Sequence, residues 1–206
     1  MEVVMDVYKR AYDHKKPLVC FDERPKQLIS ELRKPMPAKP GRAARYDYEY
    51  RRNGVANIFM MFEPLVGQRH LKVTDRRTKK DWAYCMRQLV DELYPEAETI
   101  VLVMDNLNTH KKASLYEAFE PTEAKRVADK LEIHHTPKHG SWLNMAEIEM
   151  SVISRQCLSD RMDDMDRLNS EVLSWSQARN ANESKVDWRF TTDDARIKLK
   201  KLYPAI

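Results

Sequence analysis

Glycine and cysteine are scarce in this sequence, and each scarcity excludes a class of protein. Only 4 of the 206 residues are glycine, and neither GxGxxG nor GxxxxGK[ST] occurs, so the usual glycine-rich phosphate-binding loops are missing. The 3 cysteines, Cys20, Cys85 and Cys157, lie far apart and form no CxxC pair. This pattern argues against a disulfide scaffold or a cysteine-rich zinc site and favours a reducing compartment.

Long hydrophobic runs are also missing. The longest uncharged apolar run lies near residues 56–62 and is far too short to span a membrane. The N-terminus has acidic residues where a signal peptide needs an apolar stretch. Hydrophobic residues still make up 42% of the chain, enough for a core. We therefore expect a soluble cytoplasmic protein with no membrane partner.

Positive charge is concentrated locally rather than overall. The chain has 36 Lys and Arg against 32 Asp and Glu, a net charge too small to indicate nucleic acid by itself. Residues 24–52, however, hold nine basic and three acidic residues with four prolines, which predicts an extended basic loop or edge. A second basic cluster covers residues 76–80. The candidate DNA-binding residues are Arg42, Arg45, Arg51, Arg52, Arg76, Arg77, Lys79 and Lys80.

Two interpretations of these basic segments stay open. Surface Lys and Arg also serve as ordinary solubilising charges, although the excess in residues 24–52 favours DNA. Tyr46, Tyr48 and Tyr50 alternate among the charges, a spacing that suits either stacking on bases or strand alternation into a core.

Hydrophobic periodicity predicts an α/β protein, a mixed sheet flanked by helices in three layers. The expected strands are residues 18–22, 54–64, 68–74, 99–104 and 132–136. The expected helices are residues 1–12, 81–94, 113–119, 123–131, 143–158, 165–180 and 191–202.

Two of the expected strands end in aspartate. Residues 18–21 lead to Asp22, and residues 100–104 lead to Asp105. Aspartate after a strand is often only a turn former. If the two strands lie side by side, however, the carboxylates meet at one sheet edge and repel each other unless a cation lies between them. Oxygen ligands of this kind select hard divalent metals such as Mg²⁺ or Mn²⁺.

A third acid is expected from the helix over residues 143–158. Asn144 with Glu147 also fits an ordinary capping box. Trp142, Ala146, Met150, Ile153 and Cys157 form one apolar stripe of this helix. Glu149 falls inside the stripe and Glu147 at its edge. Helix geometry therefore leaves both glutamates open as candidates.

These pieces together resemble the DDE transposases of the mariner-like superfamily, in particular the bacterial insertion sequence six-thirty branch. The matching segments are residues 20–23 (CFDE), 105–110 (DNLNTH) and 141–147 (SWLNMAE). Their order and spacing match as well, and the likeness extends over nearly the whole chain, including residues 46–52 and 188–200. Each segment alone is a weak signal, whereas the three together are specific. The resemblance implies an RNase H-like fold.

The resemblance assigns roles residue by residue. It makes Asp22 the first and Asp105 the second catalytic and metal-binding acid. Because the family pattern is Leu-Asn-x-x-Glu, it makes Glu147 the third. Asn106 and His110 are placed beside the metal ligands. The implied activity is DNA cleavage and strand transfer by an insertion-sequence transposase that uses two Mg²⁺ or Mn²⁺ ions, with no covalent enzyme intermediate.

The implied partner is double-stranded DNA, both the transposon ends and the target. The resemblance leaves open whether the chain forms a homodimer. When it binds DNA, the protein is expected to be associated with the bacterial nucleoid. Family members carry an N-terminal helix-turn-helix region, but here Asp22 comes almost at once. We therefore expect residues 1–12 to be a linker remnant, 13–160 the catalytic domain and 161–206 a helical extension packed on it. The alternatives are an inert or truncated DNA-binding fragment, and another RNase H-like nuclease such as a resolvase or an RNase.

Two other groups of residues favour structural interpretations. His110, His134, His135 and His139 match no common zinc-binding spacing, which argues against a zinc site. Trp142 is expected in the core.

Overall fold

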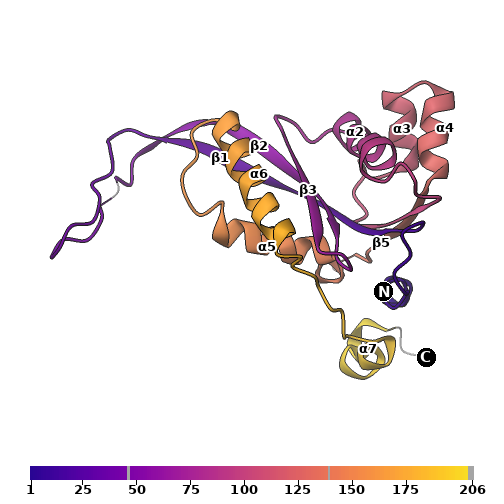
Figure 1. The fold of residues 1–206 in the computed structure, drawn as a ribbon. Coiled ribbons are helices and arrows are strands. Elements are labelled where there is room, and N and C mark those ends of the chain that lie inside the picture. Colours follow the sequence, from indigo (N-terminus) through magenta and orange to yellow (C-terminus); the bar gives the residue numbers. More distant parts are fainter. Residues whose placement is uncertain (46, 139, 204–206) are drawn as a thin grey trace.

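The computed structural model describes residues 1–45, 47–138 and 140–203, which form one sheet with helices on both faces (Figure 1). In chain order the elements are α1 (Glu2–Tyr8), β1 (Leu18–Glu31), β2 (Tyr50–Glu63), β3 (Gln68–Thr74), α2 (Lys79–Gln88), a π-helical turn (Leu89–Leu93), β4 (Ile100–Met104), α3 (Lys112–Ala118), α4 (Pro121–Asp129), β5 (Leu131–His135), a 3₁₀ turn (Ser141–Leu143), α5 (Met145–Gln156), α6 (Met165–Ala181), α7 (Thr192–Lys198) and a second 3₁₀ turn (Lys200–Leu202).

The sheet is mixed, as the sequence predicts. Its strand order is β3-β2-β1-β4-β5. The first three strands form an antiparallel meander, whereas β1, β4 and β5 run parallel to one another. The predicted α/β class, with helices flanking a mixed sheet, is confirmed.

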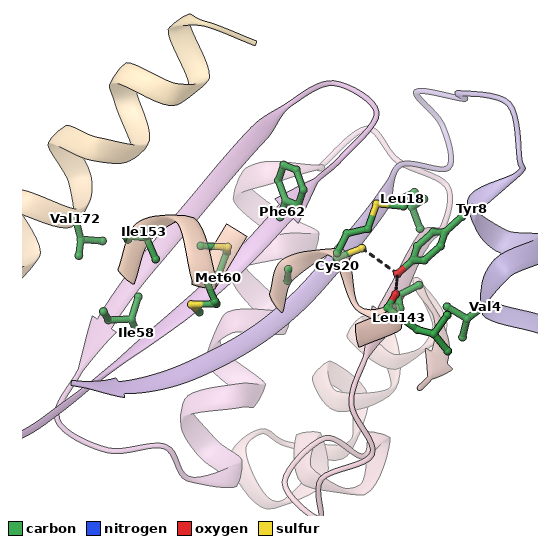
Figure 2. Close-up of a cluster of buried hydrophobic side chains, with 14 of the residues drawn as sticks. Val4, Tyr8, Leu18, Cys20, Ile58, Met60, Phe62, Leu143, Ile153 and Val172 are labelled. Atoms are coloured by element: carbon green, nitrogen blue, oxygen red, sulfur yellow. Dashed lines mark hydrogen bonds between the residues drawn. The ribbon is translucent and has the colours of Figure 1, made fainter. Parts of the chain in front are cut away.

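The strands separate two hydrophobic cores, one on each face of the sheet. Along β2, Ile58, Met60 and Phe62 point to the face covered by α1 and α5–α7, whereas Phe59 and Met61 point to the face covered by α2–α4. Figure 2 shows the first of these clusters. All of β4 is buried, which explains its unbroken apolar sequence. Both faces therefore pack against helices, and the sheet holds the loops that follow its strands rigidly.

The predicted end of the first strand at Asp22 is wrong, and the predicted basic loop or edge over residues 24–52 is a paired strand at both of its ends. Strand β1 continues to Glu31 and pairs with β2 along its length, with an irregularity between Gln27 and Ile29. Since β4 ends at Met104, the outer part of β1 has a free edge on that side, where Pro25 is tolerated. Pairing between segments distant in the chain overrides the weak local strand propensity here.

The connection between β1 and β2 projects away from the body of the protein (Figure 1). We call this connection, together with the first three residues of β2, the hairpin arm (residues 32–45 and 47–52). Two isolated bridges, Met36–Arg45 and Lys39–Arg42, keep its two sides together. Gly41, at φ +74°, makes the turn at its tip.

The helices agree with the predicted ones apart from their ends. The predicted helix over 81–94 is α2 followed by the π-helical turn, and Pro121 opens α4 as its first residue. Among the described residues, no helix is long and apolar enough to cross a membrane.

Candidate metal-binding active site

The parallel pairing of β1 and β4 brings the first two predicted acids together. Leu18 pairs with Val101, Val19 with Leu102 and Cys20 with Val103. Continuing this register by two residues sets Asp22 opposite Asp105, just beyond the end of β4. Loops at the carboxyl ends of parallel strands are the usual place for a site in such sheets.

The third acid, Glu147, lies in the first turn of α5, and a single asparagine holds that turn on the sheet. Asn144 is the N-cap: its Oδ1 accepts from the N–H of Ala146 at 3.1 Å. Its Nδ2 donates to the carbonyl of Phe21 at 2.8 Å, next to Asp22. The Tyr8 hydroxyl donates to the carbonyl of Leu143 at 2.6 Å (Figure 2). The start of α5 is thus fastened to β1 and to α1.

The charges of the other two acids act on Asp22. Burial raises the pKa of Asp22 to about 7, opposed by a hydrogen bond from the N–H of Glu23, and the charges of Glu23, Asp105 and Glu147 raise it further. Asp105 Oδ1 and Glu147 Oε2 are buried without a hydrogen bond from the described residues. Neighbouring carboxylates, here with a buried Glu147 oxygen that accepts no hydrogen bond from the described residues, are what a hard divalent cation requires. The residues present therefore fit such an ion.

His110 lies on the other side of Asp105, between two carboxylates. Its Nδ1 is 2.6 Å from Asp105 Oδ1 and its Nε2 is 3.0 Å from Glu23 Oε2, both ion-pair contacts. Burial lowers the pKa of His110, but Asp105 and Glu23 outweigh it and raise the pKa to about 9. The imidazole is therefore a cation at neutral pH.

Glu23 is a residue that the sequence analysis missed. Ligand atoms of Glu23, Asp105 and His110 all lie within 4.8 Å of one another, a tighter group than Asp22, Asp105 and Glu147 form among the described residues. The sequence does contain a signal for Glu23, because it follows Asp22 directly at the end of the predicted strand. Consecutive strand residues point to opposite faces, so Glu23 has to meet a different partner from Asp22. Asn106, predicted beside the metal ligands, is exposed, and its side chain makes no hydrogen bond to the described residues.

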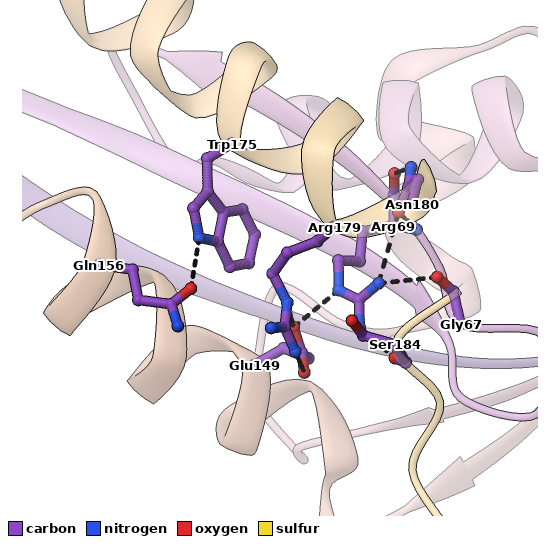
Figure 3. A network of polar contacts seen from close by, with 8 residues as sticks. All are labelled: Gly67, Arg69, Glu149, Gln156, Trp175, Arg179, Asn180 and Ser184. Atoms are coloured by element: carbon purple, nitrogen blue, oxygen red, sulfur yellow. Dashed lines mark hydrogen bonds and ion pairs between the residues drawn. The ribbon is translucent and has the colours of Figure 1, made fainter. Parts of the chain in front are cut away.

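Glu149, the alternative third acid, is already fully engaged. It is buried, and its carboxylate accepts from Arg69 Nε at 2.7 Å and from Arg179 Nη2 at 2.9 Å (Figure 3). The guanidinium of Arg69 also donates to the carbonyls of Gly67 and Ser184. This network joins β3, α5 and α6, and it leaves Glu149 no oxygen for a metal.

The candidate DNA-binding residues fall into two exposed groups. Arg42, Arg45, Arg51 and Arg52 are all exposed on the hairpin arm. The residues of the second group, Arg76, Arg77, Lys79 and Lys80, lie between β3 and α2 and in the first turn of α2. Of these, Lys79 is partly exposed and pairs with Glu117.

Several aromatic residues differ from expectation. Tyr48 is 86% exposed and Tyr50 is exposed, so burial of these two in a core is wrong, while Tyr46 lies outside the described residues. Trp142 is 39% exposed and stacks on Trp188 instead of lying in the core. It belongs to the short 3₁₀ turn rather than to α5, which removes it from the helical stripe.

The remaining histidines form no zinc cluster among the described residues. His134 pairs with Glu132, and Nδ1 of His135 is 3.1 Å from the carbonyl oxygen of Asp105. His139 lies outside the described residues.

The chain is similar to known proteins in sequence family and in fold. Residues 17–169 match the family described as DDE superfamily endonuclease. The match covers more than half of the chain, so the chain belongs to this family. No curated protein matches the chain.

Solved structures of the Mos1 mariner transposase complexes have a similar fold. The paired-end complex with Mn has a TM-score of 0.58 at 15% identity, and the alignment covers 89% of this chain and 54% of that one. The strand transfer complex has a TM-score of 0.59 at 13% identity, and the alignment covers 91% of this chain and 60% of that one. The chain thus spans little more than half the length of these proteins. At this identity the likeness concerns the fold alone, and it agrees with the RNase H-like mixed sheet.

Proposed function

We propose that this chain is the catalytic domain of an insertion-sequence transposase of the mariner-like superfamily, six-thirty branch. It would cleave DNA and transfer strands with divalent metal ions. One observation carries the proposal: Asp22, Asp105 and Glu147, which are remote in sequence, lie near enough for the charges of Asp105 and Glu147 to act on Asp22, in a chain of the DDE endonuclease family. Residues 13–160 would form the catalytic domain, 161–206 a helical extension and 1–12 a linker segment.

The three acids would hold two Mg²⁺ or Mn²⁺ ions, which on binding would lower the pKa of an attacking water and stabilise the leaving 3′ oxygen. Asp22 would bind as the carboxylate, since a cation would offset the burial and the neighbouring negative charges that raise its pKa to about 7. Asn144 would set the position of Glu147 relative to Asp22. No side chain would act as a covalent nucleophile.

The partner would be double-stranded DNA, bound by the two basic groups. From Asp22 to Glu31 strand β1 spans nine residues, roughly 30 Å at about 3.3 Å per residue. Duplex DNA with a phosphate at Asp22 would then reach the base of the hairpin arm about nine base pairs away, at about 3.4 Å per base pair. Arg51 and Arg52, paired with Ser30 and Ile29, stand at this distance.

The test is metal-dependent cleavage of duplex DNA. We expect a loss of nicking rate of more than roughly 100-fold in each of the variants Asp22→Asn, Asp105→Asn and Glu147→Gln. Losing a residue that only contacts a metal ligand costs up to about 100-fold, and these residues would bind the metal themselves. Asp166→Asn, which changes an exposed acid on α6, is the matched control and should keep the wild-type rate. A gel assay on supercoiled plasmid with Mg²⁺ or Mn²⁺ measures these rates.

The same assay separates this proposal from its rivals. Joining of a cleaved 3′ end to a second duplex supports the transposase, and cleavage without joining indicates a different nuclease. Metal binding with no cleavage indicates an inert fragment. Full activity of Asp22→Asn would contradict the assignment of the site.

A further inference from the structure

Glu23 has no role in the proposed chemistry, yet its position is tightly determined. Its side chain is 4% exposed, although it is charged and belongs to the partly accessible stretch of β1 that follows Phe21. A carboxylate is costly to bury unless it is paired. Its neighbour in space is His110, whose Nε2 is 3.0 Å from Glu23 Oε2.

His110 is held so that it cannot swing away from either carboxylate. It is completely buried, stacked near Trp82 with ring centroids 6.1 Å apart and edge-on to Phe21 at 5.3 Å. One ring nitrogen faces Glu23 and the other faces Asp105, at 2.6 Å from Oδ1. Glu23, His110 and Asp105 therefore form a continuous chain of contacts that ends on a predicted metal ligand.

We propose that Glu23 is a positioning residue, which fixes the carboxylate of Asp105 through His110. The inference deepens the proposed function and rests on it. Partners beyond the ligands orient metal-binding groups and tune their affinity, commonly by about 10–100-fold. With a negative charge on both sides, the imidazole stays between the two carboxylates and leaves the second oxygen of Asp105 free to bind a metal.

The contacts argue against Glu23, Asp105 and His110 forming a metal centre of their own. One ligand atom from each residue lies within 4.8 Å of the others, but each ring nitrogen of His110 is already in contact with a carboxylate, Nε2 with Glu23 and Nδ1 with Asp105. Glu23 consequently acts through His110 rather than on a metal directly.

The experiment compares Glu23→Gln with Glu63→Gln in the full chain. Glu63 is the matched control because it is also a buried glutamate of this sheet, bonded instead to the Tyr94 hydroxyl at 2.9 Å. Glu23→Gln should raise the Mn²⁺ dissociation constant measured by calorimetry, and the Mn²⁺ concentration for half-maximal nicking, by about 10–100-fold. Glu63→Gln should leave both unchanged, whatever each substitution does to Tm.

A double-mutant cycle tests the route through His110. In a His110→Gln background, Glu23→Gln should cause no further loss of Mn²⁺ affinity, because its effect is transmitted by the imidazole. An equal loss in both backgrounds would overturn the inference, as would wild-type Mn²⁺ affinity and half-maximal concentration in Glu23→Gln alone.

The proposed function is tested separately in the same titrations. If the wild-type chain binds no Mn²⁺, or if Asp22→Asn binds it equally well, the proposed function fails and the role of Glu23 fails with it. If Asp22→Asn abolishes binding and Glu23→Gln does not change it, only the role of Glu23 is refuted.

Discussion

Glu147 and Glu149 are two residues apart on α5 and meet opposite environments. Glu149 is buried between Arg69 and Arg179, whereas Glu147 keeps a buried oxygen that accepts no hydrogen bond from the described residues. Helix periodicity places Glu149 in the apolar stripe of α5. A buried carboxylate is costly unless it is paired, so this position calls for a basic partner. Periodicity could not name that partner, because Arg69 and Arg179 are 80 and 30 residues away in sequence. The sequence resemblance supplied the choice of Glu147 that spacing left open.

The two glutamates should therefore respond differently to the same substitution. Glu149→Gln leaves the buried Arg69 without its counter-charge, and we expect a loss of about 3–5 kcal/mol in the free energy of unfolding. Glu147→Gln removes no ion pair and should keep wild-type stability while nicking is lost. Urea unfolding of both variants measures the difference. A stable, inactive Glu149→Gln with an active Glu147→Gln would reverse the assignment.

Among the strands, short buried segments can be predicted from the sequence, whereas the outer part of β1, which is held by pairing with β2, cannot. Strand β4 and the hairpin of β2 and β3 follow from apolar runs and a glycine turn, since burial on the sheet dictates their composition. The outer half of β1 contains Pro25 and Lys26 and is stabilised by β2, whose paired residues begin at Tyr50. Such pairing between distant segments leaves no local signal. The composition of residues 24–31 therefore favours a loop or edge, where the structure has a paired strand.

Among the helices, the start of α5 provides a test. Asn144→Ala removes the N-cap, which costs about 1 kcal/mol, and also the bond to the Phe21 carbonyl beside Asp22. We expect a modest loss of stability with a larger loss of nicking rate, because Glu147 is no longer held relative to Asp22. Asn169→Ala, at an exposed position of α6, is the control and should change neither quantity. A proportionate fall in both would indicate that Asn144 only stabilises the helix.

For the whole molecule, the hairpin arm is the feature that the fold adds to the predicted basic segment. The excess of positive charge was visible in the sequence, but its projection beyond the sheet was not (Figure 1). Tyr48 and Tyr50 are exposed there beside Arg51 and Arg52. An exposed basic arm that continues the strand of Asp22 suits contact with phosphates over several base pairs.

Binding of duplex DNA should depend on this arm. Replacing both Arg51 and Arg52 by alanine should weaken binding similarly for all sequences. It should also lower the slope of log K against log salt by about 1.8, since each phosphate that is no longer neutralised accounts for about 0.9. The double change Arg189→Ala and Arg196→Ala is the control, since these basic residues flank and belong to α7, far from the arm (Figure 1). Fluorescence anisotropy at several salt concentrations measures the slope. Equal slopes for the wild type and the arm variant would show that the arm does not bind DNA.

Thermal unfolding of the wild type and Asp22→Asn at pH 8, with and without Mn²⁺, tests the central claim most directly. The folded pKa of Asp22, about 7, lies above the usual 3.8, so the metal-free wild type loses stability as pH rises from about 4 to 7. Without metal, Asp22→Asn should have the higher Tm at pH 8, and the difference should vanish towards pH 4.

Saturating Mn²⁺ should reverse that order. At about 100 times the dissociation constant it should stabilise the wild type by about 2.7 kcal/mol and Asp22→Asn far less. A metal-free wild type at least as stable as Asp22→Asn at pH 8, or an equal gain of both proteins from Mn²⁺, would contradict a cation site built from Asp22, Asp105 and Glu147.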